Sequence, residues 1–319
     1  MRRLAISPRT YRRITFLALV MVSVIIVSGA GVRVTGSGLG CPDWPTCTED
    51  SLVAPVSYHA LVEFVNRVFT GVLSVTVIVL VLGSLWRAPR RRDLVWLSLG
   101  VAFGIPVQIV IGGLSVLWEL VPPIVMAHFL ASIPIVACAV VLHRRAGIPD
   151  AELAAAAVAP ANPGVRDLAI AANLLVAAAS VVLFTGTVVT GSGPHGGDPD
   201  VKRFDIAVPE VARVHGLAVW LLLALTLGTL WLARRNDVAP SAPFQRALRL
   251  LVYVIVGQGA IGYTQYFTGV PAGLVLLHVA GSVTVWLAVL NVRLAIGKGA
   301  KAVGVDAAGA RAPSVLSPT

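Results

Sequence analysis

Four histidines stand near the beginning of alternate apolar segments: His59, His128, His215 and His278. Segments that cross a membrane in alternating directions bring such residues to a similar depth, and neutral imidazole is a common ligand of haem iron. His215 and His278 each lie roughly 10 Å inside their segments at the rise of an α-helix. Ionisable side chains at that depth usually have a function. We interpret this pair as two axial ligands of one haem, with helix-to-helix hydrogen bonding as the alternative.

The sequence also repeats itself. The segment Val34-Thr-Gly-Ser-Gly38 recurs 155 residues later as Val189-Thr-Gly-Ser-Gly193, and His128 precedes His278 by 150 residues. We therefore interpret the chain as two copies of one ancestral unit.

The first half differs from the second at one ligand position. His128 corresponds to His278, but the residue that corresponds to His215 is Asn66, because 62 residues separate Asn66 from His128 and 63 separate His215 from His278. The available histidine, His59, lies about 10 Å nearer the outer end of the same helix. Either His59 supplies the missing ligand, or a haem in this half has one strong protein ligand.

A carboxylate and an arginine accompany Asn66. Glu63 shares a helix face with His59 and Asn66, and Arg67 follows Glu63 at a spacing that permits an ion pair. A lone carboxylate inside a membrane is costly, so Glu63 is either neutralised by Arg67 or poised for chemistry. The first half thus has the features of a reaction site, whereas two histidines on one iron make an electron-transfer centre.

Composition identifies the elements that must position these residues. Of the 319 residues 57% are hydrophobic and 13% are charged, and the mean hydropathy is +0.86. Such values are typical of a membrane protein. Apolar stretches of about 20 residues, enough to span the hydrocarbon core, occur at 14–34, 62–86, 94–116, 122–142, 167–190, 210–233, 247–268 and 273–295. We predict an all-α membrane protein in which eight transmembrane helices form two parallel four-helix repeats.

The net charge of +10 does not indicate nucleic-acid binding, because the charges are sorted by side. With these spans, 20 of the 25 Lys and Arg residues fall on one side, and the other side has Arg33, Arg67, Lys202, Arg203 and Arg213. The positive-inside rule then places both termini in the cytoplasm of a multi-pass protein of the cell membrane. We interpret the clustered arginines as solvated charges that set this topology.

Four spans in each half give both halves the same orientation. We predict an N-terminal half at 1–142, a cytoplasmic linker at 143–166, a C-terminal half at 167–296 and a disordered tail at 297–319.

The outer loops carry further candidates. Cys41 and Cys47 can close a disulfide in an oxidising compartment, either as a structural staple or as a redox-active pair. Arg33 and Arg213 lie near the outer mouths of the two sites, where arginine binds carboxylates such as haem propionates, with anchoring at the membrane edge as the alternative. His195 is a candidate metal ligand or substrate contact, or a turn residue of no special role.

Taken together, these residues resemble the heme A synthase family over about residues 12–296. The likeness rests on the segment from Gly31 to Cys47, Glu63-Phe-Val-Asn66-Arg67, Ala127-His128, the loop from Gly191 to Asp198, Val214-His215-Gly216 and Leu277-His278. The resemblance implies an enzyme that oxidises the C8 methyl group of haem O to a formyl group, giving haem A.

The resemblance also implies residue roles. His215 and His278 would ligate a stable haem B, His128 would ligate the substrate haem O, and Glu63 would be the functional carboxylate beside His59, Asn66 and Arg67. Cys41 and Cys47 match a cysteine pair found in many members. Asn66 departs from the family pattern Glu-x-x-His-Arg, so the role of that position does not transfer.

The expected partners are haem O, delivered by a haem O synthase, an electron acceptor of unknown identity and the lipid bilayer, with a homo-oligomer left open. Two alternative functions are a di-haem electron carrier, such as a quinol-linked cytochrome subunit, and a haem transporter. The electron carrier would explain the histidines but not Glu63, the cysteine pair or the difference at Asn66. Chromatography of extracted porphyrins would separate all three functions.

Overall fold

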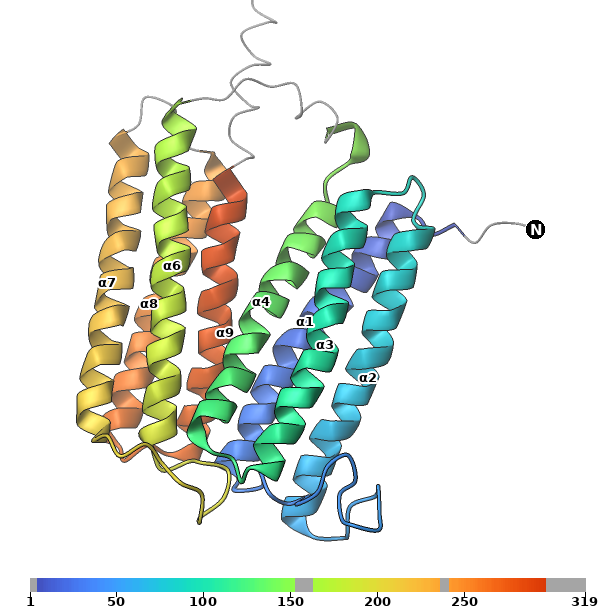
Figure 1. The fold of residues 1–319 in the computed structure, drawn as a ribbon. Helices are drawn as coiled ribbons and strands as arrows, with labels where there is room; N and C mark the ends of the chain where they lie inside the picture. The colour runs from blue at the N-terminus through green and yellow to red at the C-terminus, as the bar shows by residue number, and fades with distance from the viewer. Residues whose placement is uncertain (1–4, 153–162, 236–240, 297–319) are drawn as a thin grey trace, which may run out of the picture.

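The fold consists of long α-helices. A computed structural model describes residues 5–152, 163–235 and 241–296, and these residues form eight helices and no extended strand (Figure 1). All eight are long and apolar enough to cross a membrane, which confirms the predicted spans. The helices are α1 (Pro8–Val34), α2 (Tyr58–Trp86), α3 (Arg92–Leu117), α4 (Pro122–Ala146), α6 (Pro163–Ser192), α7 (Val208–Arg235), α8 (Ala242–Phe267) and α9 (Ala272–Ala295).

Local signals fix where several helices begin. Ser57 occupies the N-cap position of α2 without a side-chain capping hydrogen bond, prolines occupy the first turn of α4, and Pro271 is the N-cap of α9. Helix α1 begins earlier than residue 14, because Ser7 caps it by accepting a hydrogen bond from the backbone N–H of Thr10. The polar start of α1 carries no apolar signal, so the span prediction missed it.

The eight helices form two rings of four. In the first ring α1 and α3 each pack against both α2 and α4, and in the second α6 and α8 each pack against both α7 and α9. The two rings stand side by side in Figure 1 and meet through α1, α4, α6 and α9. Within each ring, α2 faces α4 and α7 faces α9 across the centre, so residues on these diagonal helices can approach one another.

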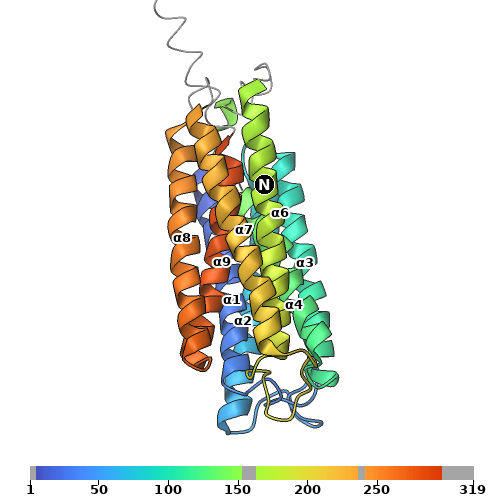
Figure 2. The ribbon, with the colours of Figure 1, turned by 90° about the vertical axis from the view of Figure 1, so that its left-hand side faces the viewer.

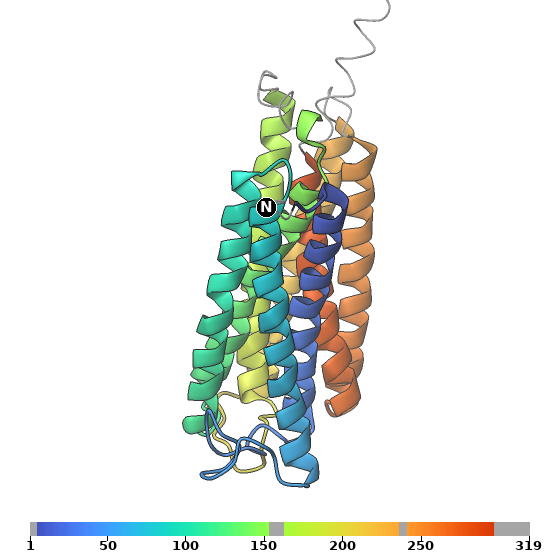
Figure 3. The same cartoon turned by 90° about the vertical axis from the view of Figure 1, so that its right-hand side faces the viewer.

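The two rings are joined at their common interface. Inside the membrane the indole Nε1 of Trp286 on α9 donates a hydrogen bond to the carbonyl oxygen of Ile133 on α4, 3.1 Å away. At one end of the molecule the loops 35–57 and 193–207 lie together (Figures 2 and 3). The backbone N–H of Gly38 donates to the carbonyl oxygen of Gly197 across a distance of 2.7 Å. The outer loops therefore form one layer over both rings.

The opposite end differs from the prediction of solvated arginines at two positions. Arg87 and Arg91 are buried. Arg87 donates to both carboxylate oxygens of Asp150, at 3.0 and 3.1 Å, and Arg91 makes a 2.7 Å ion pair with Asp93. Buried charges require such partners. Asp93 is two residues from Arg91, whereas Asp150 is 63 residues from Arg87 and reaches it only in the folded chain. These arginines hold helix ends together.

The boundaries that we predicted between the halves are only partly covered. Helix α4 continues past residue 142 to Ala146, and α6 begins at Pro163, inside the predicted linker. The rest of that linker, residues 153–162, and the predicted tail at 297–319 lie outside the described residues.

The orientation in the membrane can be tested by labelling. In a Cys138→Ser background we expect Leu52→Cys, in the loop layer, to react with a membrane-impermeant maleimide in intact cells, because Leu52 is 68% exposed and the charge distribution puts its loop outside. Arg90→Cys, on the exposed turn at the opposite end, should react only after lysis. If only Arg90→Cys were labelled in intact cells, the orientation in the membrane would be the reverse of the one predicted.

Candidate haem sites

Two histidines face each other at the centre of the second ring. The imidazole rings of His215 on α7 and His278 on α9 have their centroids 6.4 Å apart, with their planes at 78°. A metal bound to an imidazole nitrogen at about 2.0–2.1 Å lies about 3.2 Å from the centroid of that ring. One iron midway between the two rings would satisfy both. The spacing of this pair therefore fits bis-imidazole ligation.

Neighbouring helices shape the space around both rings. A Cβ atom on Gly186 of α6 would lie 3.2 Å from Cε1 of His215, and one on Gly262 of α8 would lie 3.1 Å from Cε1 of His278. Each imidazole thus packs directly on helix backbone. The hydroxyl of Thr185 lies 3.1 Å from Nδ1 of His215, which directs Nε2 away from α6. Nδ1 of His278 is buried without a partner among the described residues.

The first ring repeats half of this arrangement. His128 on α4 packs on Gly112 of α3, whose Cβ would lie 3.2 Å from Cε1 of the imidazole. The side-chain amide of Gln108 donates to the carbonyl oxygen of His128 at 3.1 Å. Nδ1 of His128, like that of His278, is buried without a described partner.

Gln108 has a counterpart that the sequence analysis missed. Gln258 on α8 donates to the carbonyl oxygen of His278, as Gln108 does to that of His128, and each glutamine precedes its histidine by 20 residues. The signal was present in the sequence as Gln-x-x-x-Gly, found at 108–112 and at 258–262. The two segments lie 150 residues apart, the same offset as the two histidines.

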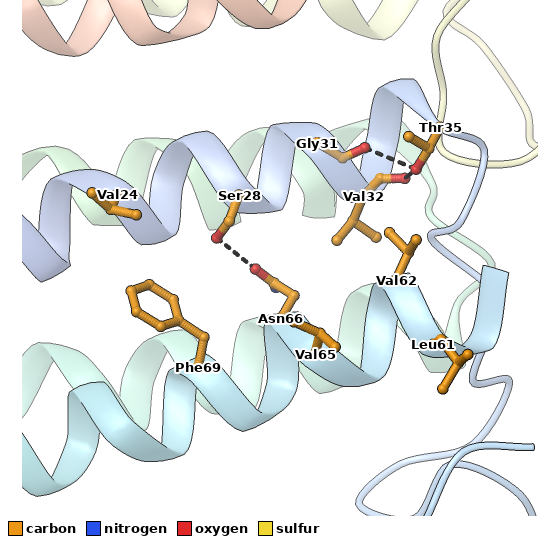
Figure 4. Close-up of a pocket in the computed structure, with 10 residues that line it drawn as sticks. All are labelled: Val24, Ser28, Gly31, Val32, Thr35, Leu61, Val62, Val65, Asn66 and Phe69. Atoms are coloured by element: carbon orange, nitrogen blue, oxygen red, sulfur yellow. Dashed lines mark hydrogen bonds between the residues drawn. The ribbon is translucent and has the colours of Figure 1, made fainter. Parts of the chain in front are cut away.

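The first ring has an open pocket between α1 and α2. Asn66 on α2 and Gly31 on α1 line a cavity of about 590 Å³ between these helices, together with apolar side chains (Figure 4). The Ser28 hydroxyl donates to Oδ1 of Asn66 at 2.7 Å. A Cβ atom on Gly31 would meet nothing within 4 Å. The position that an imidazole ring fills in the second ring is therefore open in the first.

Glu63 is paired and holds the outer loop. Its Oε1 accepts hydrogen bonds from Arg67 at 2.6 and 3.1 Å, and its Oε2 accepts one from the backbone N–H of Cys41 at 2.8 Å. Arg67 also donates to the carbonyl oxygens of Cys41, Asp43 and Thr46. Glu63 and Arg67 thus form the ion pair that their spacing permits, and the pair clamps the loop onto α2.

That loop contains the predicted disulfide and reaches across the ring. Cys41 and Cys47 form a disulfide, and both residues are buried. Trp44, between them, packs on α3 so closely that a Cβ atom on Gly113 would lie 2.6 Å from the indole. Gly113 follows Gly112, on which His128 packs. The disulfide loop is therefore a lid over the outer end of the first ring, held by α2 on one side and α3 on the other.

His59 lies at the outer rim. It is exposed in the first turn of α2, and its Nδ1 lies 3.0 Å from the hydroxyl of Ser37. The backbone there is tightly packed, because a Cβ atom on Gly40 would lie 2.2 Å from the carbonyl oxygen of His59. The loop thus holds His59 away from the level of Asn66.

The remaining candidates lie in or near the loop layer. Arg33 donates to the carbonyl oxygen of Thr190 at 2.6 Å, but its Nε is buried without a partner among the described residues. Arg213 is exposed, two residues before His215. His195 lies 2.8 Å from the carbonyl oxygen of Val270, so it joins its loop to the turn before α9. The described residues contain no cluster of three or more His, Cys, Asp or Glu that could hold a metal ion.

The comparison with known proteins agrees with this architecture. A "Heme A synthase" from Listeria monocytogenes is 26% identical over 282 residues, covering 82% of this chain and 87% of the relative. The "Heme A synthase" of Lysinibacillus sphaericus is 33% identical over 113 residues, which cover 35% of this chain and 37% of the relative.

A family model described as cytochrome oxidase assembly protein, COX15-CtaA, matches residues 12–57 and 53–290, a range that contains both histidine sites and the lid. The chain therefore belongs to the COX15-CtaA family of cytochrome oxidase assembly proteins.

Proposed function

We propose that this chain is a membrane oxidoreductase that oxidises the C8 methyl group of haem O to a formyl group, successively, and so produces haem A. The observation that carries the proposal is the difference between two rings built alike. One ring has two facing histidines, 6.4 Å apart. The other has one such histidine, a pocket between α1 and α2 that Asn66 lines, and a lid clamped by Glu63 and Arg67.

The C-terminal ring is the proposed site of haem B. His215 and His278 would supply both axial ligands, Thr185 orients the first imidazole, and Gln258 fixes the backbone at the second. Haem B ligated in this way transfers electrons and leaves no coordination position for a substrate. Gly186 and Gly262 allow the imidazoles of His215 and His278 to pack against the helix backbone. Their positions are therefore set by the protein.

The N-terminal ring is the proposed site of the substrate haem. His128 would hold the iron, with its backbone fixed by Gln108 and its ring by Gly112. The buried, unpartnered Nε of Arg33 is a donor suited to a carboxylate. We assign it to a haem propionate and place Arg213 at the mouth of the second site.

Glu63 is proposed as the functional carboxylate at the outer end of the substrate site. Its hydrogen bonds to Arg67 and to the N–H of Cys41 fix both oxygens, so the group is preorganised. In that position it would stabilise positive charge at the methyl carbon or orient water. The lid above it, with Trp44 on Gly113, would keep bulk water out.

The burial of both cysteines supports a structural role for the disulfide, because a buried bond is shielded from thiols in solution. Both termini are proposed to be cytoplasmic, as the charge distribution indicates, and the two rings are proposed to be copies of one duplicated unit.

The reaction separates this proposal from its two alternatives. Purified protein would be supplied with haem O, and the porphyrins extracted afterwards would be resolved by chromatography. We expect haem A to accumulate. A di-haem electron carrier or a haem transporter would return haem O unchanged, and that result would overturn the proposed function.

The haem B assignment predicts the effect of a glycine substitution. Gly262→Val should displace the His278 ring, because even a Cβ atom there approaches Cε1 to 3.1 Å, and overpacking of this kind costs about 1–3 kcal/mol. Absorption spectra of the purified variant should lose most of the low-spin bis-imidazole haem, as those of His215→Ala and His278→Ala should.

Gly257→Val on the same helix is the matched control, since a Cβ atom on Gly257 meets nothing within 4 Å. Its low-spin spectrum should equal that of the unmodified protein. An unchanged spectrum in both histidine variants would remove haem B from this ring.

The role of Glu63 predicts a loss of turnover without a loss of haem B. In Glu63→Gln the single amide oxygen can replace only one of the two carboxylate oxygens, so the amide NH2 group faces either Arg67 or the Cys41 N–H, both of which are donors. We expect haem A formation to fall about 10²- to 10⁴-fold, the contribution of one well-placed acid or base. Glu119→Gln, an exposed carboxylate on the same side, is the control and should remain active. Full activity of Glu63→Gln would show that Glu63 only holds the lid in place and takes no part in the reaction.

A further inference from the structure

The pocket between α1 and α2 occupies a defined place in the repeated architecture. In the second ring the imidazole of His215 fills the space beside Gly186. Gly31 precedes Gly186 by 155 residues, the offset of the repeated Val-Thr-Gly-Ser-Gly segments. Gly31 and Asn66 both line the pocket (Figure 4). The pocket is therefore the space that a ligating imidazole would take, left open because asparagine is the shorter side chain.

The residues that support this position have changed with it. In the second ring Thr185 contacts Nδ1 of His215, but at the same offset the first ring has Ala30, which has no hydroxyl. In the first ring Ser28 supports Asn66, and the corresponding residue of the second ring is Leu183. The first ring is thus built for asparagine and not for a histidine lost by chance.

The hydrogen bonds leave one group of Asn66 free. Its Oδ1 accepts from the hydroxyl of Ser28 at 2.7 Å, and no described residue is a partner for its Nδ2. The other hydroxyl in the pocket, that of Thr35, is engaged with the carbonyl oxygens of Gly31 and Val32. The remaining lining residues are apolar or glycine. The Asn66 amide is therefore the one side-chain N–H donor among the residues that line this pocket.

We propose that Asn66 and Ser28 form a distal pocket in which the iron of the N-terminal haem binds a small, exchangeable ligand that accepts a hydrogen bond from Nδ2 of Asn66. This inference rests on the proposed binding of a haem by His128. His59 does not compete, because it is held at the rim by Ser37. The polarity, donors and access of a distal pocket decide which small ligands a haem takes. Water on ferric iron, or a diatomic molecule on ferrous iron, has the required size and acceptor atom.

Carbon monoxide is a suitable probe, because it binds only five-coordinate ferrous haem. The full-length protein would be purified with haem in both rings, reduced, and exposed to carbon monoxide. We expect one of the two haems to form the complex, and His128→Ala to abolish that fraction. The haem between His215 and His278 has no free position and should not react.

Rebuilding the second-ring site in the first ring should close the pocket. In the double variant Ala30→Thr and Asn66→His the new imidazole gains the hydroxyl support that Thr185 gives His215. We expect carbon monoxide binding to fall about tenfold or more, since an imidazole then fills the sixth position. The single variant Asn66→His, which lacks the supporting hydroxyl, should be intermediate.

A vibrational measurement tests the hydrogen bond itself. Asn66→Val keeps the pocket open but removes the donor, so carbon monoxide should still bind while the C–O stretching band moves to higher frequency. Ser28→Ala should broaden that band, because the amide loses its fixed orientation. Thr229→Ala, which removes a hydroxyl on α7 that donates to the carbonyl oxygen of Leu225, is the control for loss of a helix hydroxyl and should leave the band unchanged.

The outcomes separate this inference from the proposed function. If haem A formed but no carbon monoxide complex were found, the proposed distal pocket would be wrong and the proposed enzyme activity would stand. An unshifted C–O band in Asn66→Val would overturn the role of the amide. If neither haem A nor a His128-dependent haem were found, the proposed function would fail and the pocket with it.

Discussion

Both ring centres depend on the close approach of an imidazole to the backbone of a neighbouring helix. His128, His215 and His278 each pack on a glycine, and a Cβ atom at that glycine would lie only 3.1–3.2 Å from Cε1 of the imidazole, close enough to displace it. A buried histidine has few rotamers open to it when one side is closed by backbone, so its nitrogens point in a set direction. The glycines thus restrict the orientation of three imidazole rings at the centres of the two helix rings.

The same constraint explains how two similar rings come to differ in chemistry. Where an imidazole packs on the glycine, as His215 does on Gly186, the space beside the glycine is filled. Where it is uncovered, as at Gly31, a pocket remains. On the proposed haem assignments, a difference at one residue, with matching differences in the neighbouring hydroxyls of Ser28 and Thr185, would turn a site with two imidazole ligands into one that leaves a coordination position free. The arrangement of the helices need not change, because α1 and α2, which bound the pocket, correspond to α6 and α7, which carry Gly186 and His215.

Much of the fold could be predicted from the sequence, because the bilayer imposes simple rules. Apolar length determined the eight spans, and two nearby cysteines on the outer side predicted the disulfide. The polar contacts were harder. The burial of Arg87 and Arg91, the Gln108 and Gln258 hydrogen bonds, and the bonds from Arg67 to loop carbonyls all join segments distant in the sequence or depend on backbone atoms. Hydropathy carries no record of such partners, and only the two glutamines were marked in the sequence, by the repeated Gln-x-x-x-Gly segments. The Glu63–Arg67 pair, four residues apart, was within reach of sequence reasoning.

The outer loops link the two sites mechanically. The lid is tied to α2 through Glu63 and to the other loop through the Gly38–Gly197 hydrogen bond. That second loop is joined to the turn before α9 through His195. Arg33 of α1 donates to the carbonyl oxygen of Thr190 in the last turn of α6, just before this loop. A movement of the lid that admitted a substrate would therefore disturb contacts at the outer ends of α1 and α9, the helices by which the two rings meet. Because α9 carries His278, the loop layer that closes the first ring also contacts the turn that leads into the helix of the proposed haem B ligand.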